Sequence, residues 1–141
     1  MKRILLIAML LGIALFSHSQ EADSLIVPTE VYSMPAEFRE LTQKMYGTSQ
    51  SDSLLYLSVI EDGIKLAEKR NNDREKVAFL YQKMSYYKKR DDLKKSNQIS
   101  KQITEIYNGN TSAFTDGEIL GMLGQCYENL EQYDRAYQFY L

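Results

Sequence analysis

The chain has 141 residues, which suits a single domain with a modest hydrophobic core. Hydrophobic residues make up 44% of it and charged residues 26%, a composition that excludes an intrinsically disordered chain. Only 2 Pro and 7 Gly are present, so a turn-dense β fold is disfavoured and long helices are expected.

Residues 1–19 have the three-part layout of a secretory signal peptide. Residues 1–3 are a short basic start, and residues 4–16 form an apolar run of 13 that is broken only by Gly12. Small side chains precede Gln20, so we expect cleavage after Ser19. A run of 13 is short for a bilayer span, which disfavours the alternative of an uncleaved N-terminal anchor.

The sequence therefore predicts an exported protein, either periplasmic or secreted. Loss of Lys2 and Arg3 leaves 15 basic against 19 acidic side chains, a net charge of −4 that argues against nucleic acid as a partner. Cys126 is the only cysteine, so no internal disulfide can form. We expect Cys126 to be buried, because it lies on an apolar helical stripe; an intermolecular disulfide is the alternative.

Residues 20–34 lack helical periodicity and are expected to form an extended leader, whereas residues 35–141 are predicted to form a helical domain. The first helix is expected to begin at Pro35 and to break at residues 47–51. Asp52 or Ser53 is expected to cap the second helix, which stops at Asn71-Asn72. The residues that repeat at helical spacing are Phe38, Leu41, Thr42 and Met45 in the first helix and Leu57, Ile60, Ile64 and Ala67 in the second.

The third and fourth helices are separated by the turn at residues 90–92. Asn72 and Glu75 have the spacing of a capping box at the start of the third helix. The fourth helix is expected to end at residues 108–110, with Gly109 as a left-handed C-cap. The predicted apolar face is Val77, Leu80, Tyr81, Met84 and Tyr87 in the third helix, and the fourth carries Leu93, Ser96, Ile99, Ile103, Ile106 and Tyr107.

A fifth helix is expected to open with a second capping box, formed by Thr115 and Glu118. Residues 131–132 turn the chain, and a sixth helix starts near Tyr133 or Asp134. The apolar face of the fifth helix is Ile119, Met122, Leu123, Cys126 and Leu130. Because an amphipathic hairpin cannot bury its stripe alone, this periodicity predicts an all-α fold of stacked antiparallel hairpins.

Residues 117–141 closely resemble a tetratricopeptide repeat (TPR). The family pattern has a large residue, then Leu-Gly, a Tyr, a turn Tyr, a small residue and an aromatic one. Its positions here are Leu120, Leu123-Gly124, Tyr127, Tyr133, Ala136 and Tyr140. Residues 77–110 match less well, with Lys83 and Met84 in place of Leu-Gly, and residues 36–69 match weakly. A generic helical bundle with chance matches is the alternative.

The resemblance implies a TPR-like α-solenoid of about three hairpins. In that family Gly124 and Ala136 would let two helices approach closely, while Tyr127 and Tyr133 would fill the groove between them. The first helix of each hairpin lines a concave, partner-binding groove. Carried onto this chain, the groove residues are Tyr81, Gln82, Ser85, Lys88 and Lys89 in one unit and Met122, Gln125, Glu128 and Asn129 in the next.

The last predicted helix stops at Leu141, which makes it too short to be stable alone. It is expected to leave Met122, Cys126 and Leu130 partly uncovered. The chain is then expected to be a fragment, or to cover this C-terminal edge with a partner or a second copy.

Catalytic chemistry is not expected. The only His is His18, within the predicted signal peptide, and a lone Cys126 cannot form a thiolate metal site within one chain. Adjacent carboxylates at residues 61–62 and 91–92 usually face solvent. We therefore expect no enzyme, no metal and no cofactor.

Residues 83–101 are basic and allow two interpretations. They carry Lys83, Lys88, Lys89, Arg90, Lys94, Lys95 and Lys101. An anion-binding or membrane-surface patch is one interpretation, and a solvated helix face is the favoured one.

The function expected from these features is that of an exported protein–protein interaction module. Its partner is expected to be a protein or peptide. The alternative, also from the resemblance, is the periplasmic sensor part of a longer transmembrane signalling protein with a histidine kinase or DNA-binding output.

Overall fold

The computed structural model describes residues 33–48 and 52–141. The predicted signal peptide, residues 1–19, and most of the predicted leader lie outside the described residues. Ser33 and Met34 precede the first described helix without helical structure, as expected for the end of the leader. Pro35, predicted as the first helical residue, is instead the N-cap of that helix.

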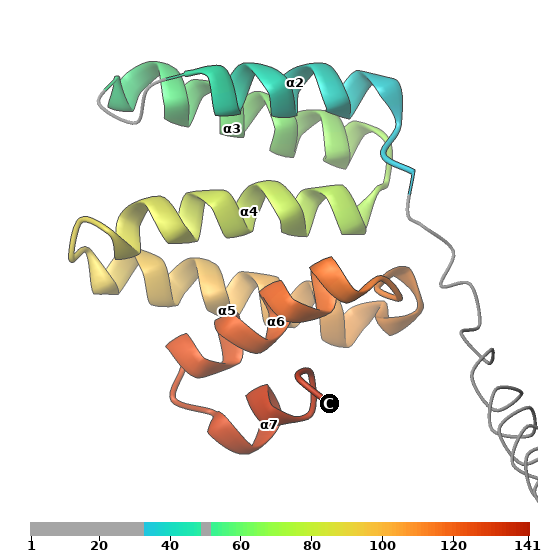
Figure 1. The fold of residues 1–141 in the computed structure, drawn as a ribbon, viewed down its shortest axis with the longest axis vertical. Coiled ribbons are helices and arrows are strands. Elements are labelled where there is room, and N and C mark those ends of the chain that lie inside the picture. Colours follow the sequence, from blue (N-terminus) through green and yellow to red (C-terminus); the bar gives the residue numbers. More distant parts are fainter. Residues whose placement is uncertain (1–32, 49–51) are drawn as a thin grey trace, which may run out of the picture. The chain divides into compact units, whose positions relative to one another are not determined.

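The described part of the chain is all-α, as predicted, and contains no strand. Figure 1 shows the helices lying side by side, with the chain reversing direction at each connection. Each helix packs on the next along the chain, and α4 also contacts α6. The elements are α2 (Ala36–Gly47), α3 (Ser53–Lys69), α4 (Asp73–Lys88), α5 (Leu93–Gly109), the 3-10 turn η1 (Thr111–Ala113), α6 (Gly117–Asn129) and α7 (Tyr133–Tyr137).

Side chains cap four of the helix starts. Asp52 accepts a hydrogen bond from the Leu55 N–H, which confirms the predicted start of α3. Asn72 accepts one from the Glu75 N–H, which confirms the start of α4. Asp92 caps α5 in the same way.

The predicted cap of α6 is wrong by one residue. Asp116, rather than Thr115, accepts the hydrogen bond from the Ile119 N–H at 3.1 Å. An ionised carboxylate is favoured at a helix N-terminus, and Arg74 also holds this carboxylate in place.

Three connections share one turn geometry. Asn71, Asp91 and Glu131 have φ of 51°, 57° and 59°, and the next N–H returns to a carbonyl five residues earlier. This is the hydrogen bond of a Schellman motif, which ends α3, α4 and α6 and leads directly into the following helix. Gly109 was predicted as a left-handed cap, but no described glycine has positive φ. Helix α5 instead continues through Gly109 and is followed by η1.

Helix α4 lies at the centre of the core. Its predicted single apolar face is incomplete, because Phe79 and Tyr86 are buried along with Val77, Leu80 and Met84. Contacts with α3, α5 and α6 account for this, since a helix covered on several sides needs apolar residues around its circumference. Leu93 is exposed in the first turn of α5, contrary to the predicted stripe.

The C-terminal residues cover part of α6. The Phe139 ring stacks on Tyr127 with centroids 5.4 Å apart and meets the edge of Tyr107 at 5.3 Å. Cys126 is fully buried, as its place on an apolar helical stripe predicts, so the expectation that the short last helix leaves it partly uncovered is wrong. Met122 and Leu130 are half-buried.

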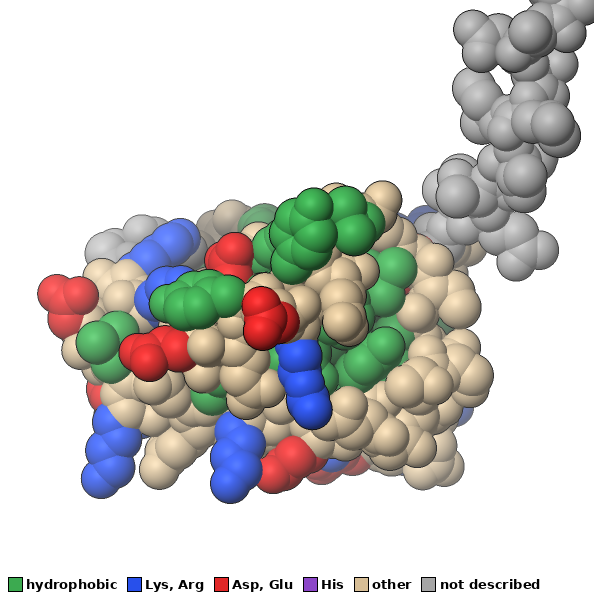
Figure 2. All heavy atoms as spheres, turned by 90° about the horizontal axis from the view of Figure 1, so that it is seen from below, with side chains coloured by type: hydrophobic (Ala, Val, Ile, Leu, Met, Phe, Trp, Pro, Cys, Tyr) green, Lys and Arg blue, Asp and Glu red, His purple; other side chains and the backbone are tan. Residues whose placement is uncertain are grey.

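Two TPR-based expectations also need correction at this end. Tyr133 does not fill a groove, because it is 66% exposed in the first turn of α7. Ala136 is buried, but the atoms nearest to a Cβ placed at Gly124 belong to the Tyr140 ring. Figure 2 views the face below Figure 1, where hydrophobic side chains lie exposed among charged ones. Exposed apolar residues near the C-terminus are Tyr133, Tyr137, Tyr140 and Leu141.

Among the described residues, no helix combines the length and apolar character needed to cross a membrane.

Candidate functional site

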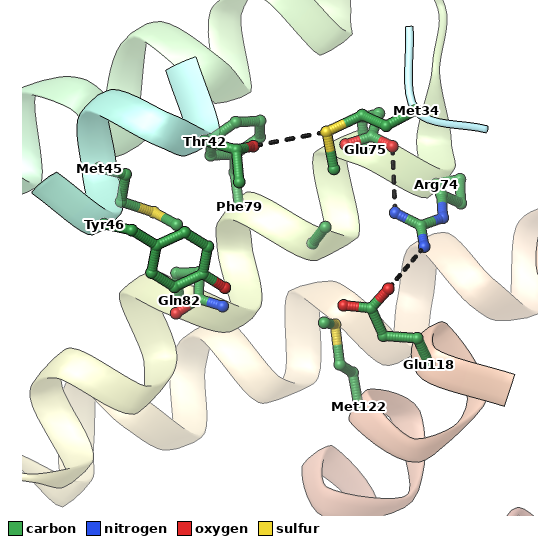
Figure 3. Close-up of a pocket in the computed structure, with 11 residues that line it drawn as sticks. Met34, Thr42, Met45, Tyr46, Arg74, Glu75, Phe79, Gln82, Glu118 and Met122 are labelled. Carbon is green, nitrogen blue, oxygen red and sulfur yellow. Dashed lines mark hydrogen bonds and ion pairs between the residues drawn. The ribbon is translucent and has the colours of Figure 1, made fainter. Parts of the chain in front are cut away.

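A pocket of about 110 Å³ opens between α2, α4 and α6 (Figure 3). These helices are not consecutive, so the pocket is built from segments far apart in the sequence. The lining residues are Met34, Thr42, Met45, Tyr46, Arg74, Glu75, Ala78, Phe79, Gln82, Glu118 and Met122. Two of the predicted groove residues, Gln82 and Met122, are among them.

The apolar wall consists largely of flexible and aromatic side chains. Met45 and Phe79 are buried behind the pocket, and Met122 projects toward it from α6 in Figure 3. Phe79 packs against Phe38 of α2 with ring centroids 6.4 Å apart. Methionine adapts its shape readily, so this wall can accommodate different apolar groups.

Met34 lies at the edge of the pocket and is held there by α2. The Arg39 Nη2 donates a hydrogen bond to the Met34 carbonyl oxygen at 3.1 Å. The Thr42 hydroxyl contacts the Met34 sulfur at 3.6 Å. The segment before α2 is therefore part of the pocket wall.

The other end of the pocket is formed by a buried arginine, Arg74, in the first turn of α4. Its Nε and Nη2 donate to the two Asp116 carboxylate oxygens at 3.1 Å each, and its Nη1 donates to Glu75 at 3.0 Å. Glu118 lies 3.4 Å from Nη2. Three carboxylates therefore surround one guanidinium, which leaves this end of the pocket formally negative.

Asp116 has two roles in this cluster: it caps α6 and it binds Arg74. Burial by itself raises the pKa of its carboxyl, but hydrogen bonds from Arg74 and from the Ile119 N–H outweigh burial and lower that pKa. The carboxylate is thus charged at neutral pH and links the N-terminal ends of α4 and α6.

Tyr81 and Gln125, both predicted groove residues, form a direct bridge between α4 and α6. The Tyr81 hydroxyl donates to Gln125 Oε1 at 2.5 Å, and Ser85 also hydrogen-bonds this hydroxyl. Burial raises the pKa of Tyr81, because removal from water disfavours the phenolate. These three residues fix the spacing of two pocket helices without lining the pocket.

The remaining four predicted groove residues lie elsewhere. Lys88 and Lys89 are exposed at the C-terminal end of α4. Glu128 is exposed and hydrogen-bonds Tyr140. Asn129 faces α5 rather than the groove: its Nδ2 lies 2.9 to 3.0 Å from Ser96 Oγ, Asn97 Oδ1 and Ser100 Oγ. Asn129 thus joins the last turn of α6 to α5.

Sequence reasoning missed most of the pocket, although helical spacing contains the signal. Residues four apart lie on the same face of a helix. Ala78 and Arg74 lie four and eight residues before Gln82, and Glu118 lies four residues before Met122. All three line the pocket. The residues of α2 were missed because residues 36–69 match the repeat pattern weakly.

The basic stretch of residues 83–101 is partly neutralised within the chain. Lys83 pairs with Glu61 of α3, and Lys95 pairs with Asp92 at 2.8 Å. The Arg90 guanidinium lies 3.7 Å from the centre of the Tyr86 ring. These contacts favour the interpretation as a solvated helix face.

The lining of the pocket offers apolar, amide, hydroxyl and carboxylate groups. Cys126 lies outside it, and burial raises the pKa of that thiol to about 12, which leaves it protonated. In the described ranges, 33–48 and 52–141, no cluster of three or more His, Cys, Asp or Glu side chains is placed to hold a metal ion.

Comparison with protein-family models, with curated proteins and with solved structures gives no match to the chain.

Proposed function

We propose that the chain is an exported, TPR-like protein-interaction module whose pocket between α2, α4 and α6 binds a peptide segment of a partner protein. The observation that carries this proposal is the pocket itself, which three non-consecutive helices form together. All three run in the same general direction, with α6 inclined to the other two (Figure 1). In a stack of hairpins these are the first helices of successive units, the position that the family uses for its groove.

Two features support a repeat architecture. Packing runs mainly between neighbouring helices, as in proteins whose units contact only the next unit. The Schellman hydrogen bonds join residues 72 to 67, 92 to 87 and 132 to 127, so the same turn recurs at multiples of 20 residues. A recurring turn at fixed spacing favours a repeated supersecondary unit over an irregular bundle.

The size of the pocket favours a peptide side chain over a cofactor. Pockets for drug-sized ligands usually measure about 300–1,000 Å³, whereas this one measures about 110 Å³. One apolar side chain fills such a space. Additional binding energy would have to come from contacts along the exposed faces of the three helices, which a peptide can reach.

Selection from a random peptide library displayed on phage tests this proposal. The test variant is Ala78→Leu, which adds three carbon atoms inside the pocket, and the control is Gln98→Leu, which introduces the same residue on the exposed face of α5. We expect selected peptides to bind the native chain and Gln98→Leu equally, and to bind Ala78→Leu at least about tenfold more weakly. Peptides that bind all three proteins alike would show that the pocket is not the binding site.

A further inference from the structure

The pocket offers a partner two different environments about one helical turn apart. Met122 contributes to the apolar wall, and Glu118, four residues earlier on the same helix, contributes to the acidic end. A helix rises about 5.4 Å per turn, which sets the separation of these two features along α6.

The apolar part has room for one aliphatic side chain. The whole pocket, apolar and acidic parts together, measures about 110 Å³, which is already smaller than the roughly 150 Å³ of an engineered protein cavity that binds benzene. A leucine or methionine side chain is therefore a better match than an aromatic ring, and the flexible Met45 and Met122 can adjust to either shape.

The acidic part cannot readily accept an anion, although it contains an arginine. Arg74 already donates through Nε, Nη1 and Nη2 to the carboxylates of Glu75 and Asp116, and Nη2 also faces Glu118. One positive and three negative groups leave a formal charge of −2. An incoming carboxylate would meet this surplus, whereas a cation would reduce it.

Glu118 is the member of this cluster that a partner can reach. Its side chain is 68% exposed, while those of Arg74 and Glu75 are 6% and 1% exposed. Its contact with Arg74, at 3.4 Å, is also the longest in the cluster. The Glu118 carboxylate can therefore turn toward a ligand cation while Asp116 and Glu75 still neutralise Arg74.

From this arrangement, and resting on the proposed function, we infer that the pocket selects a peptide in which a Leu or Met side chain lies two positions from Lys or Arg. In an extended peptide, side chains two residues apart point the same way and lie about 6.8 Å apart. That spacing matches the separation of the apolar wall from Glu118. Side chains of adjacent residues point to opposite sides of an extended peptide, so they could not reach the apolar wall and Glu118 together.

The predicted leader does not have this chemistry. Residues 20–32 contain Glu21, Asp23 and Glu30 and no Lys or Arg. A synthetic peptide of residues 20–32 is therefore expected not to compete for the pocket.

Three fluorescent peptide pools test the inference on the full chain. Each pool has a fixed central Leu, flanked two positions away on both sides by Lys, Gln or Glu, with the other positions randomised. Fixing both sides removes any dependence on peptide direction. By fluorescence anisotropy, we expect the Lys pool to bind at least about tenfold more tightly than the Glu pool.

The variant Glu118→Gln should reduce this preference to less than about threefold, since it removes the reachable charge. Glu128→Gln, an exposed acid on the same helix outside the pocket, should leave the preference unchanged. Equal binding of the Lys and Glu pools, or competition by the peptide of residues 20–32, would overturn the inference while groove binding stands. If instead Ala78→Leu weakens the binding of none of the pools, the proposed function is wrong, and the inference with it.

Discussion

Arg74 in the first turn of α4 holds Asp116, the N-cap of α6, through two parallel hydrogen bonds of 3.1 Å. The two residues are 42 positions apart in the sequence, and Arg74 is buried. A bidentate pair of this kind fixes both the distance and the relative orientation of the two helix ends. It therefore determines the shape of the acidic end of the pocket.

The variant Asp116→Asn should reveal how much this pair stabilises the fold. Asn caps a helix about as well as Asp, so the change removes the charge while keeping the cap. We expect the free energy of unfolding in urea to fall by about 2–4 kcal/mol, because Arg74 would lose a charged partner in a buried position. Asp92→Asn, which changes the exposed cap of α5, should have a smaller effect. Equal losses in the two variants would contradict a special role for the Arg74 pair.

The contribution of Asp116 should depend on pH in one direction. Its folded-state pKa is lowered, so the unfolded chain binds this proton more readily than the folded chain does. The stabilisation is complete above the ordinary Asp pKa of about 3.9 and is lost as pH falls through the lower folded value. Urea unfolding of the native chain and Asp116→Asn should therefore show a stability difference that is constant from pH 7 to 5 and shrinks below about pH 4. A difference that grows on acidification would be incompatible with this.

Three glycines provide a graded test of helix packing. A Cβ at Gly63 would lie 2.5 Å from the buried Phe79 ring, which cannot move away, so Gly63→Ala should cost about 1–3 kcal/mol. Gly121 has nothing within 4 Å, so Gly121→Ala should stabilise α6 by up to about 1 kcal/mol through helix propensity. Gly124→Ala should fall between them, because the Tyr140 ring it meets is half exposed and can turn aside. Thermal melting of the three variants checks this order.

Cys126 should behave as a reporter of unfolding. Its thiol is buried and its pKa is raised to about 12, so little reactive thiolate exists at pH 8. We expect iodoacetamide to leave Cys126 unmodified in native protein and to label it fully in urea, as measured by mass spectrometry. In the variant Gln98→Cys, native protein should gain one label, at the exposed position. A second label in native protein would mean that α6 opens on the time scale of the reaction.

Local sequence signals were sufficient to predict where most of the helices begin and which of their residues are buried. The caps at Asp52 and Asn72 and the buried positions Ile60, Ile64 and Ala67 follow from capping chemistry and from spacing of three and four residues. These signals act within one or two turns, so they can be recognised without knowledge of the tertiary structure.

The charged end of the pocket could not be predicted in the same way. Arg74 in the first turn of a helix would ordinarily face solvent, and its burial depends on Asp116 in another helix. Thr115 and Asp116 are both good N-caps, so only that distant contact decides between them. The α2 side of the pocket could not be predicted either, because Thr42 and Tyr46 become pocket residues only when α2 lies next to α4.

The pocket also brings together α2 and α6, which are far apart in the sequence. Helices that pack mainly on their neighbours along the chain can detach from either end of the helical domain at a lower free-energy cost than global unfolding. A side chain bound in this pocket would touch α2, α4 and α6 simultaneously, and so would act as a cross-link between the outer helices. Occupancy would then suppress fraying from the α2 end and make unfolding more cooperative. The affinity for the partner and the resistance of these helices to separation would thus depend on the same contact.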